Sequence, residues 1–198
     1  EAMMTLNFEH ARLIPIVGTG SGKEKEQRAT SALLAVLQIV RPLSKSLLSH
    51  YGAPRSSRAT VECFIEPIFT LTSGAKVRPD GLIQIQSGKK DQFTALVEVK
   101  TGSAKLDVDQ INSYVEIARN EDFDCVLTIS NEIAPQPGIH PTAGINVRSN
   151  SKVKVFHLSW TSILATAVME KVHRGIEDPE QAWILGELVR YLEHPLSG

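Results

Sequence analysis

The part of the sequence that decides the fold reads RPDGLI at 78–83 and LVEVKTG at 96–102. Between these two runs, SGKKD at 87–91 has the composition of a hairpin turn. We therefore expect two antiparallel strands, over 82–86 and 94–100, joined by this turn.

The two strands of this hairpin carry charged residues in an apolar setting. Because side chains alternate across a strand, Glu98 and Lys100 lie on the same face as Leu96. In an antiparallel hairpin, the start of the first strand meets the end of the second, which brings Asp80 close to Glu98 and Lys100. The sequence thus predicts that two carboxylates and one ammonium group converge at one edge of the sheet.

This combination of charges is typical of a magnesium centre. Burying a charge in an apolar strand is costly unless the charge is paired or binds a metal. Mg²⁺ is bound in proteins by one or two carboxylates together with water and phosphate oxygens. Such an ion lowers the pKa of bound water and stabilises charge on phosphorus, while a lysine can position or activate the attacking water. The sequence therefore predicts phosphodiester hydrolysis, with Asp80, Glu98 and Lys100 as the catalytic residues.

The same residues carry a family resemblance. Pro79-Asp80, followed by Glu98-x-Lys100 on the next strand, resembles the signature of the PD-(D/E)XK nuclease superfamily, which includes restriction endonucleases and recombination exonucleases. Gln110-x-x-x-Tyr114 on the following predicted helix resembles the Q-x-x-x-Y element of the exonuclease-like branches. The resemblance covers about residues 23–130, and the iron–sulfur cysteines carried by some members of that branch are absent from the sequence.

The resemblance implies further roles at the site. It implies Mg²⁺ as the cofactor, with Mn²⁺ able to replace it, and it adds the carbonyl of Val99 to the ligands Asp80 and Glu98. It also implies an acidic ligand from the first helix, for which we choose Glu26. Gln110 and Tyr114 would hold the substrate strand.

Three of these residues have structural alternatives. Glu26 lies on the apolar face of its predicted helix, where a solvated glutamate is not expected, but an acid at a helix start is also favoured by the helix dipole. Glu62 and Glu66 are weaker substitutes for it. Gln110 could instead complete a capping box with Asp107, in which case Tyr114 would only cover the edge of the core.

The elements around the hairpin complete the fold. We expect helices over 23–40, from Pro42 to about 50, over 106–120 and 160–172, and from Pro179 onward, with strands over 61–71, 124–130 and 153–158. The order predicts an α/β fold with a restriction-endonuclease-like core. The elements of this core follow the order helix–three strands–helix–strand along the chain. They form a mixed central sheet that is flanked by helices, with extra helices at the C-terminal end. We expect one nuclease-like domain over 1–198, with its core at about 23–160 and a helical extension at about 160–194.

Composition excludes several classes of protein. The chain has 198 residues, of which 42% are hydrophobic, and a net charge of −1, so it is neither disordered nor a basic coat for nucleic acid. Cys63 and Cys125 lie far apart and predict buried free thiols in a reducing compartment, not a zinc site. No apolar run is long enough for a membrane span, so we expect a cytoplasmic protein without a membrane partner. The six histidines lack ligand spacing, and His140 is expected to be solvated in a long loop over 131–152.

These observations lead to one main hypothesis and two alternatives. The main hypothesis is a metal-dependent nuclease acting on nucleic acid, with DNA as the first candidate. One alternative is a catalytically inactive nuclease-like module that binds nucleic acid or regulates a larger protein. The other is an interaction domain that uses its C-terminal helix. A homodimer stays open, because many enzymes that cut both strands are dimers.

Overall fold

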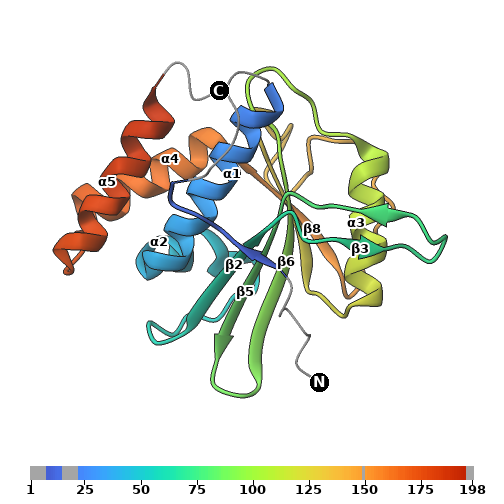
Figure 1. Cartoon of the computed structure of the whole chain (residues 1–198), viewed down its shortest axis with the longest axis horizontal. Helices are drawn as coiled ribbons and strands as arrows, with labels where there is room; N and C mark the ends of the chain where they lie inside the picture. Colours follow the sequence, from blue (N-terminus) through green and yellow to red (C-terminus); the bar gives the residue numbers. More distant parts are fainter. Residues whose placement is uncertain (1–7, 15–21, 149, 195–198) are drawn as a thin grey trace.

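The protein is described by a computed structural model over residues 8–14, 22–148 and 150–194. Its centre is a six-stranded sheet in the order β1-β2-β5-β6-β7-β8, with helices on both faces (Figure 1). The strands are β1 (Glu9–His10), β2 (Thr60–Ile65), β3 (Phe69–Thr70), β4 (Lys76–Val77), β5 (Gly81–Ser87), β6 (Asp91–Val99), β7 (Cys125–Ser130) and β8 (Lys154–Ser159). The helices are α1 (Gly22–Ile39), α2 (Arg41–Leu48), η1 (Ser49–Tyr51), α3 (Val108–Asn120), α4 (Trp160–Val168), η2 (Met169–Arg174) and α5 (Pro179–Glu193).

The sheet is mixed, with three antiparallel and two parallel strand pairs. Strands β2, β5 and β6 pair antiparallel, and the predicted hairpin is β5–β6, with Gly81 opposite Val97. Strand β7 pairs parallel to β6, and β8 parallel to β7. A parallel neighbour needs a crossover connection, and α3 supplies it between β6 and β7. The predicted mixed sheet in the order helix–three strands–helix–strand is therefore confirmed.

The first predicted strand is shorter than expected. We expected one strand over 61–71, but β2 ends at Ile65 and the chain turns at Glu66, whose φ is 47°. Pro67 follows, and a proline has no N–H with which to continue a ladder. The chain then forms β3, which pairs with β4 in a separate two-stranded sheet.

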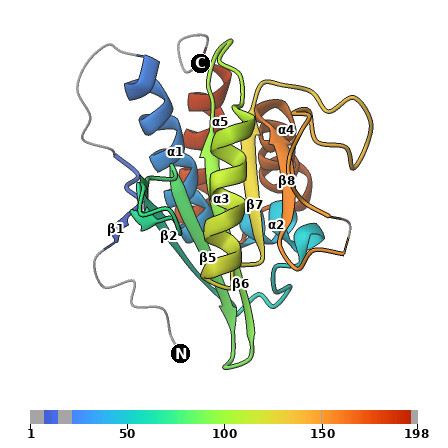
Figure 2. The same ribbon diagram turned by 90° about the vertical axis from the view of Figure 1, so that its right-hand side faces the viewer.

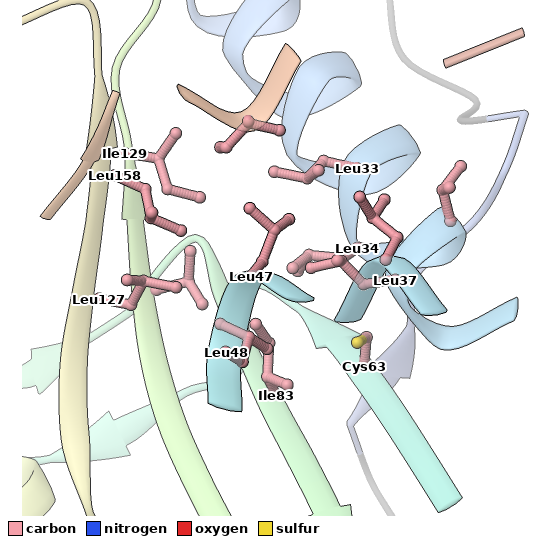
Figure 3. Packing of buried hydrophobic residues seen from close by; sticks show 14 of the residues in the cluster. Leu33, Leu34, Leu37, Leu47, Leu48, Cys63, Ile83, Leu127, Ile129 and Leu158 are labelled. Carbon is pink, nitrogen blue, oxygen red and sulfur yellow. The ribbon is translucent and has the colours of Figure 1, made fainter. Parts of the chain in front are cut away.

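The alternation of side chains along β6 separates two cores. Ala95, Val97 and Val99 face the larger cluster, which α1, α2, α4 and α5 cover, whereas Leu96 faces the smaller cluster under α3. Figure 2 shows α3 on one face of the sheet and the other long helices behind it. Figure 3 shows how the leucines of α1 and α2 in the larger cluster pack towards the strands.

The remaining elements follow the sequence signals. Pro42 lies in the first turn of α2, and α1 ends just before it. Asp178 caps α5, because its Oδ1 accepts hydrogen bonds from the main chain of Glu180 and Gln181 at 2.9 and 3.0 Å. Both Cys63 and Cys125 are buried free thiols. No single described helix meets the length and hydropathy requirements of a membrane span; α1 and the segment Arg41–Tyr51, bent by 106°, meet them only when taken together.

Candidate active site

Asp80 lies where the hairpin closes, immediately before β5. Its Oδ2 accepts a hydrogen bond of 2.7 Å from the main-chain N–H of Val99, at the end of β6. Its carbonyl accepts another from the N–H of Glu66, at 3.0 Å. The antiparallel pairing therefore brings Asp80 to the end of β6, as the hairpin geometry predicts.

Lys100 stands among acidic side chains at this end of the sheet. Its Nζ lies 2.6 Å from Glu98 Oε1 and 3.5 Å from Glu26 Oε1. The Glu98 side chain has no exposed surface, whereas 17% of Lys100 and 16% of Glu26 is exposed. Glu26 reaches the site because it lies one turn before Ala29 on the buried face of α1. The structure thus brings together Asp80, Glu98, Lys100 and Glu26.

Behind this centre, a tyrosine holds Glu98. The hydroxyl of Tyr114 donates a hydrogen bond of 2.6 Å to Glu98 Oε2, and Gln110 Nε2 donates one of 3.0 Å to the same hydroxyl. Because Glu98 uses its other oxygen for Lys100, both oxygens of its carboxylate are engaged. Asp107 caps α3 by accepting from the N–H of Gln110. The predicted cap is therefore present, while the side chain of Gln110 turns to Tyr114 instead of closing the capping box.

The substrate contact predicted for Tyr114 needs a correction. Tyr114 has no exposed surface, so its ring and hydroxyl cannot contact a substrate in this structure. Its place on the buried face of α3 makes it a support for Glu98. Gln110 is only partly buried, and the substrate contact predicted for it stays a prediction.

Burial and mutual charge shift the ionisation of this centre. Burial, together with the charge of Glu98, raises the pKa of Asp80 well above its ordinary value, although the Val99 N–H opposes the shift. Burial also raises the pKa of Glu26, against the attraction of Lys100. For Lys100, burial lowers the pKa, but the hydrogen bond and charge of Glu98, with the other two carboxylates, outweigh it and leave the pKa raised. Lys100 is therefore an ammonium at neutral pH, suited to orient a water or offset charge and not to remove a proton.

The donor chemistry of this centre suits a hard cation. Asp80, Glu98 and Glu26 present carboxylate oxygens, which Mg²⁺ and Mn²⁺ prefer. The carboxylates of Asp80 and Glu26, whose pKa values burial raises, gain from a nearby positive charge. Across residues 8–14, 22–148 and 150–194, no group of three or more His, Cys, Asp or Glu side chains is spaced to hold a metal ion as it stands. Binding of one ion by all three acids would therefore require their side chains to move closer together.

The other residues predicted for the site lie at the border of the cluster of Asp80, Glu98, Lys100 and Glu26 or outside it. Val99 meets Asp80 through its N–H, and the role predicted for its carbonyl stays a prediction. Glu66 lies beside Asp80, but its side chain accepts a hydrogen bond from Gln27. Glu62 lies opposite Gln84, farther along the pair β2–β5, so it is not part of this cluster.

A polar row next to the site was missed in the sequence. Thr128 of β7 is opposite Glu98 and also opposite His157 of β8. Its Oγ1 lies 2.7 Å from His140 Nε2 and 2.9 Å from His157 Nδ1. His140 was expected to be solvated; instead it fastens the 131–152 loop to the sheet. Burial, and then the neighbouring His157, lower its pKa to about 4. Only the parallel register of β7 and β8 reveals this row.

A second missed contact comes from the C-terminal helices. The indole Nε1 of Trp160, the first residue of α4, donates a hydrogen bond of 2.8 Å to the carbonyl of Lys100. Trp160 is 9% exposed, so this bond is largely shielded from water. The helical extension thus fixes the main chain of a predicted catalytic residue.

Comparisons with known proteins add one distant likeness. No family model matches the chain, and no curated protein is significantly similar to it. Among solved structures, it is similar to the MspJI restriction endonuclease in complex with a 27-mer oligonucleotide, at a TM-score of 0.37 and 15% identity. The match covers 89% of this chain and 40% of that one, so the chain spans about two fifths of that protein's length. The fold described above rests on the strand order and pairing of the chain itself.

Proposed function

We propose that the protein is a metal-dependent nuclease of the PD-(D/E)XK type and that DNA is its substrate. The observation that carries this proposal is the cluster formed by Asp80, Glu98 and Lys100 where the β5–β6 hairpin closes, with Glu26 added by α1. An ordinary ion pair on a protein surface joins one acidic side chain to one basic side chain. Here two acids, Glu98 and Glu26, pair with one ammonium in a largely buried setting, and Asp80 lies close enough for their charges to act on it. A second cation would complete this arrangement.

Each residue then has a defined task. Asp80, Glu98 and Glu26 hold Mg²⁺ or Mn²⁺, and the carbonyl of Val99 is a further candidate ligand. When bound, the metal ion polarises the phosphate and lowers the pKa of a coordinated water. Lys100 keeps its proton and orients the attacking water or offsets the charge that develops on the phosphate.

The surrounding residues keep this centre in place. Tyr114 fixes one oxygen of Glu98 and thereby limits the rotation of this carboxylate. Trp160 holds the carbonyl of Lys100 and thereby the end of β6. Asp80 is fixed by the N–H of Val99, which leaves its Oδ1 available to a ligand.

The test is cleavage of labelled single- and double-stranded DNA in Mg²⁺, Mn²⁺ or EDTA. Asp80→Asn keeps an oxygen for the Val99 N–H, and Lys100→Met keeps the length of the side chain. We expect each to lower the cleavage rate about 100-fold or more, the scale on which a charge-stabilising group contributes. Glu62→Gln and Lys89→Met, on exposed positions of β2 and the hairpin tip, are matched controls and should cut like the unaltered protein.

The outcomes separate the proposal from its alternatives. Metal-dependent cutting that is lost in both variants and kept in both controls supports the nuclease. Nucleic-acid binding without cutting, with no Mn²⁺ binding by calorimetry, would support the inactive module instead. Cutting that survives Asp80→Asn would assign the activity to another site or a contaminant.

A further inference from the structure

A small cavity of about 130 Å³ lies just beyond the ends of β6 and β7, where residues of α1, α4 and α5 also line it. Its lining combines apolar and polar residues. The apolar ones include Trp160, Leu164 and Leu192, and the polar ones are Thr101, Asn131 and Thr161.

The cavity is joined to the proposed site by direct chain connections. Thr101 follows Lys100 in the chain, and Trp160 is hydrogen-bonded to the Lys100 carbonyl at 2.8 Å. Ala29, which also lines it, lies one helical turn from Glu26 on α1. A group that enters the cavity is therefore next to whatever occupies the acidic centre.

The size and lining select one kind of group. An apolar cavity of about 150 Å³ in another protein accommodates a benzene molecule, so about 130 Å³ suits a single ring. The indole of Trp160 and the two leucines offer apolar contact to the faces of a ring. The hydroxyls of Thr101 and Thr161 offer hydrogen-bonding groups to its polar edge, while the Nδ2 of Asn131 donates to the carbonyl of Gly102 at 3.0 Å.

We propose that this cavity is a subsite for one unpaired pyrimidine base, carried by the strand whose phosphate lies at the acidic centre. This inference rests on the proposed function and sharpens it: the substrate is single-stranded, or frayed, at the point of cleavage. A base within a duplex is stacked and paired, and leaving the stack costs free energy, whereas an unpaired base enters freely. Because Trp160 also holds Lys100, a base in the cavity would contact the residue that fixes the catalytic strand.

The test uses tryptophan fluorescence in EDTA, so that binding is measured without cutting. The chain has two tryptophans, and Trp183 is 66% exposed, so Trp183→Phe leaves Trp160 as the reporter. The probes are a short oligothymidylate and an abasic strand of equal length. We expect the oligothymidylate to quench Trp160 and to bind about 5- to 150-fold more tightly than the abasic strand, the range measured for one stacked base. The same oligothymidylate annealed to its complement should bind less tightly.

Two variants made in this Trp183→Phe background locate the effect. Leu164→Phe fills the cavity and should remove the preference for the base-bearing strand. Ala165→Phe adds the same ring at the next position of α4, which is exposed and outside the cavity, and should keep it.

The results distinguish this subsite from the nuclease itself. Metal-dependent cutting together with equal affinity for the two strands would overturn the subsite and leave the nuclease. A base-dependent quench without cutting would support the subsite and count against the nuclease. Neither cutting nor a base-dependent quench would overturn both.

Discussion

The bond between Tyr114 and Glu98 is the interaction of the site whose removal can be predicted best. Both side chains have no exposed surface, and their oxygens lie 2.6 Å apart. Tyr114→Phe removes one hydroxyl and leaves the ring in place, so the packing under α3 is retained. One oxygen of a buried carboxylate then has no donor from α3.

The structure sets the expected size of this effect. A hydrogen bond to a charged group contributes about 1.5–3 kcal/mol to stability. The side chain of Gln110 also loses its acceptor, but it is only partly buried, so water can replace the hydroxyl. For a chain of this length, each kcal/mol shifts the melting temperature by about 2–4 °C. We therefore expect Tyr114→Phe to melt roughly 3–12 °C below the unaltered protein.

The assay is urea unfolding followed by far-ultraviolet circular dichroism, with thermal melts alongside. Tyr51→Phe is the matched control, because Tyr51 is a half-buried tyrosine outside the acidic centre whose ring stacks on Phe156. Its free energy of unfolding should stay within about 0.5 kcal/mol of the unaltered protein. If Tyr114→Phe also changed by no more than the control, the reasoning that Tyr114 stabilises a buried charge would be wrong.

Three further predictions concern residues in or near the site. Burial raises the pKa of Asp80, so the ionisation of this carboxyl costs stability as the pH rises through the raised value. Asp80→Asn should therefore raise the melting temperature in metal-free buffer, and by a larger amount at higher pH. A difference in melting temperature that stays constant with pH would contradict this explanation. Burial lowers the pKa of His140 from 6.5 to about 4, so the unfolded chain takes up a proton that the folded chain does not, and stability falls as the pH drops from about 6.5 to about 4. Because the ring is half exposed, we expect the free energy of unfolding to fall by about 1–2 kcal/mol over this pH range. His140→Gln should reduce this fall, as measured by melts at several pH values. A variant whose stability depends on pH as in the unaltered protein would refute the prediction. A Cβ at Gly81 would lie 2.5 Å from Leu34 Cδ1, so Gly81→Ala should cost about 1–3 kcal/mol in urea unfolding. Gly22→Ala is the control and should not lower the free energy of unfolding, because no atom lies within 4 Å of the added Cβ. Equal losses of stability in the two variants would contradict the packing explanation.

The acidic centre could be predicted because its main parts are local. The turn at 87–91 fixes the pairing of β5 with β6, and the two-residue period places Glu98 and Lys100 on one face. The position of Asp80 near Glu98 and Lys100 follows from the same strand pairing, without knowledge of the rest of the fold. Glu26 is not local. It was chosen because a solvated glutamate is not expected on an apolar helix face and because the family resemblance implies an acidic ligand from the first helix.

The parts that were not predicted depend on long-range register. The contact of Thr128 with His157 depends on the parallel pairing of β7 and β8, and nothing in the local sequence sets that register. The contact with His140 depends on the path of the loop between these strands. The donor from Trp160 to Lys100 depends on how α4 packs against the sheet. Similarly, the left-handed turn at Glu66 cannot be derived from the β-prone run around it, although Pro67 signals a break.

The separation between Lys100 and Trp160 has a consequence for how the protein is made. The two residues are 60 positions apart, and a ribosome adds about 5–20 residues per second, so roughly 3–12 seconds pass between their synthesis. During that interval the β5–β6 hairpin can form, since its contacts are short in sequence and close early. The carbonyl of Lys100 at the end of β6 can accept its hydrogen bond from Trp160 only after the start of α4 has been synthesised. We expect a nascent chain that ends before residue 160 to contain the paired acids and the lysine but to leave the Lys100 carbonyl without its indole donor.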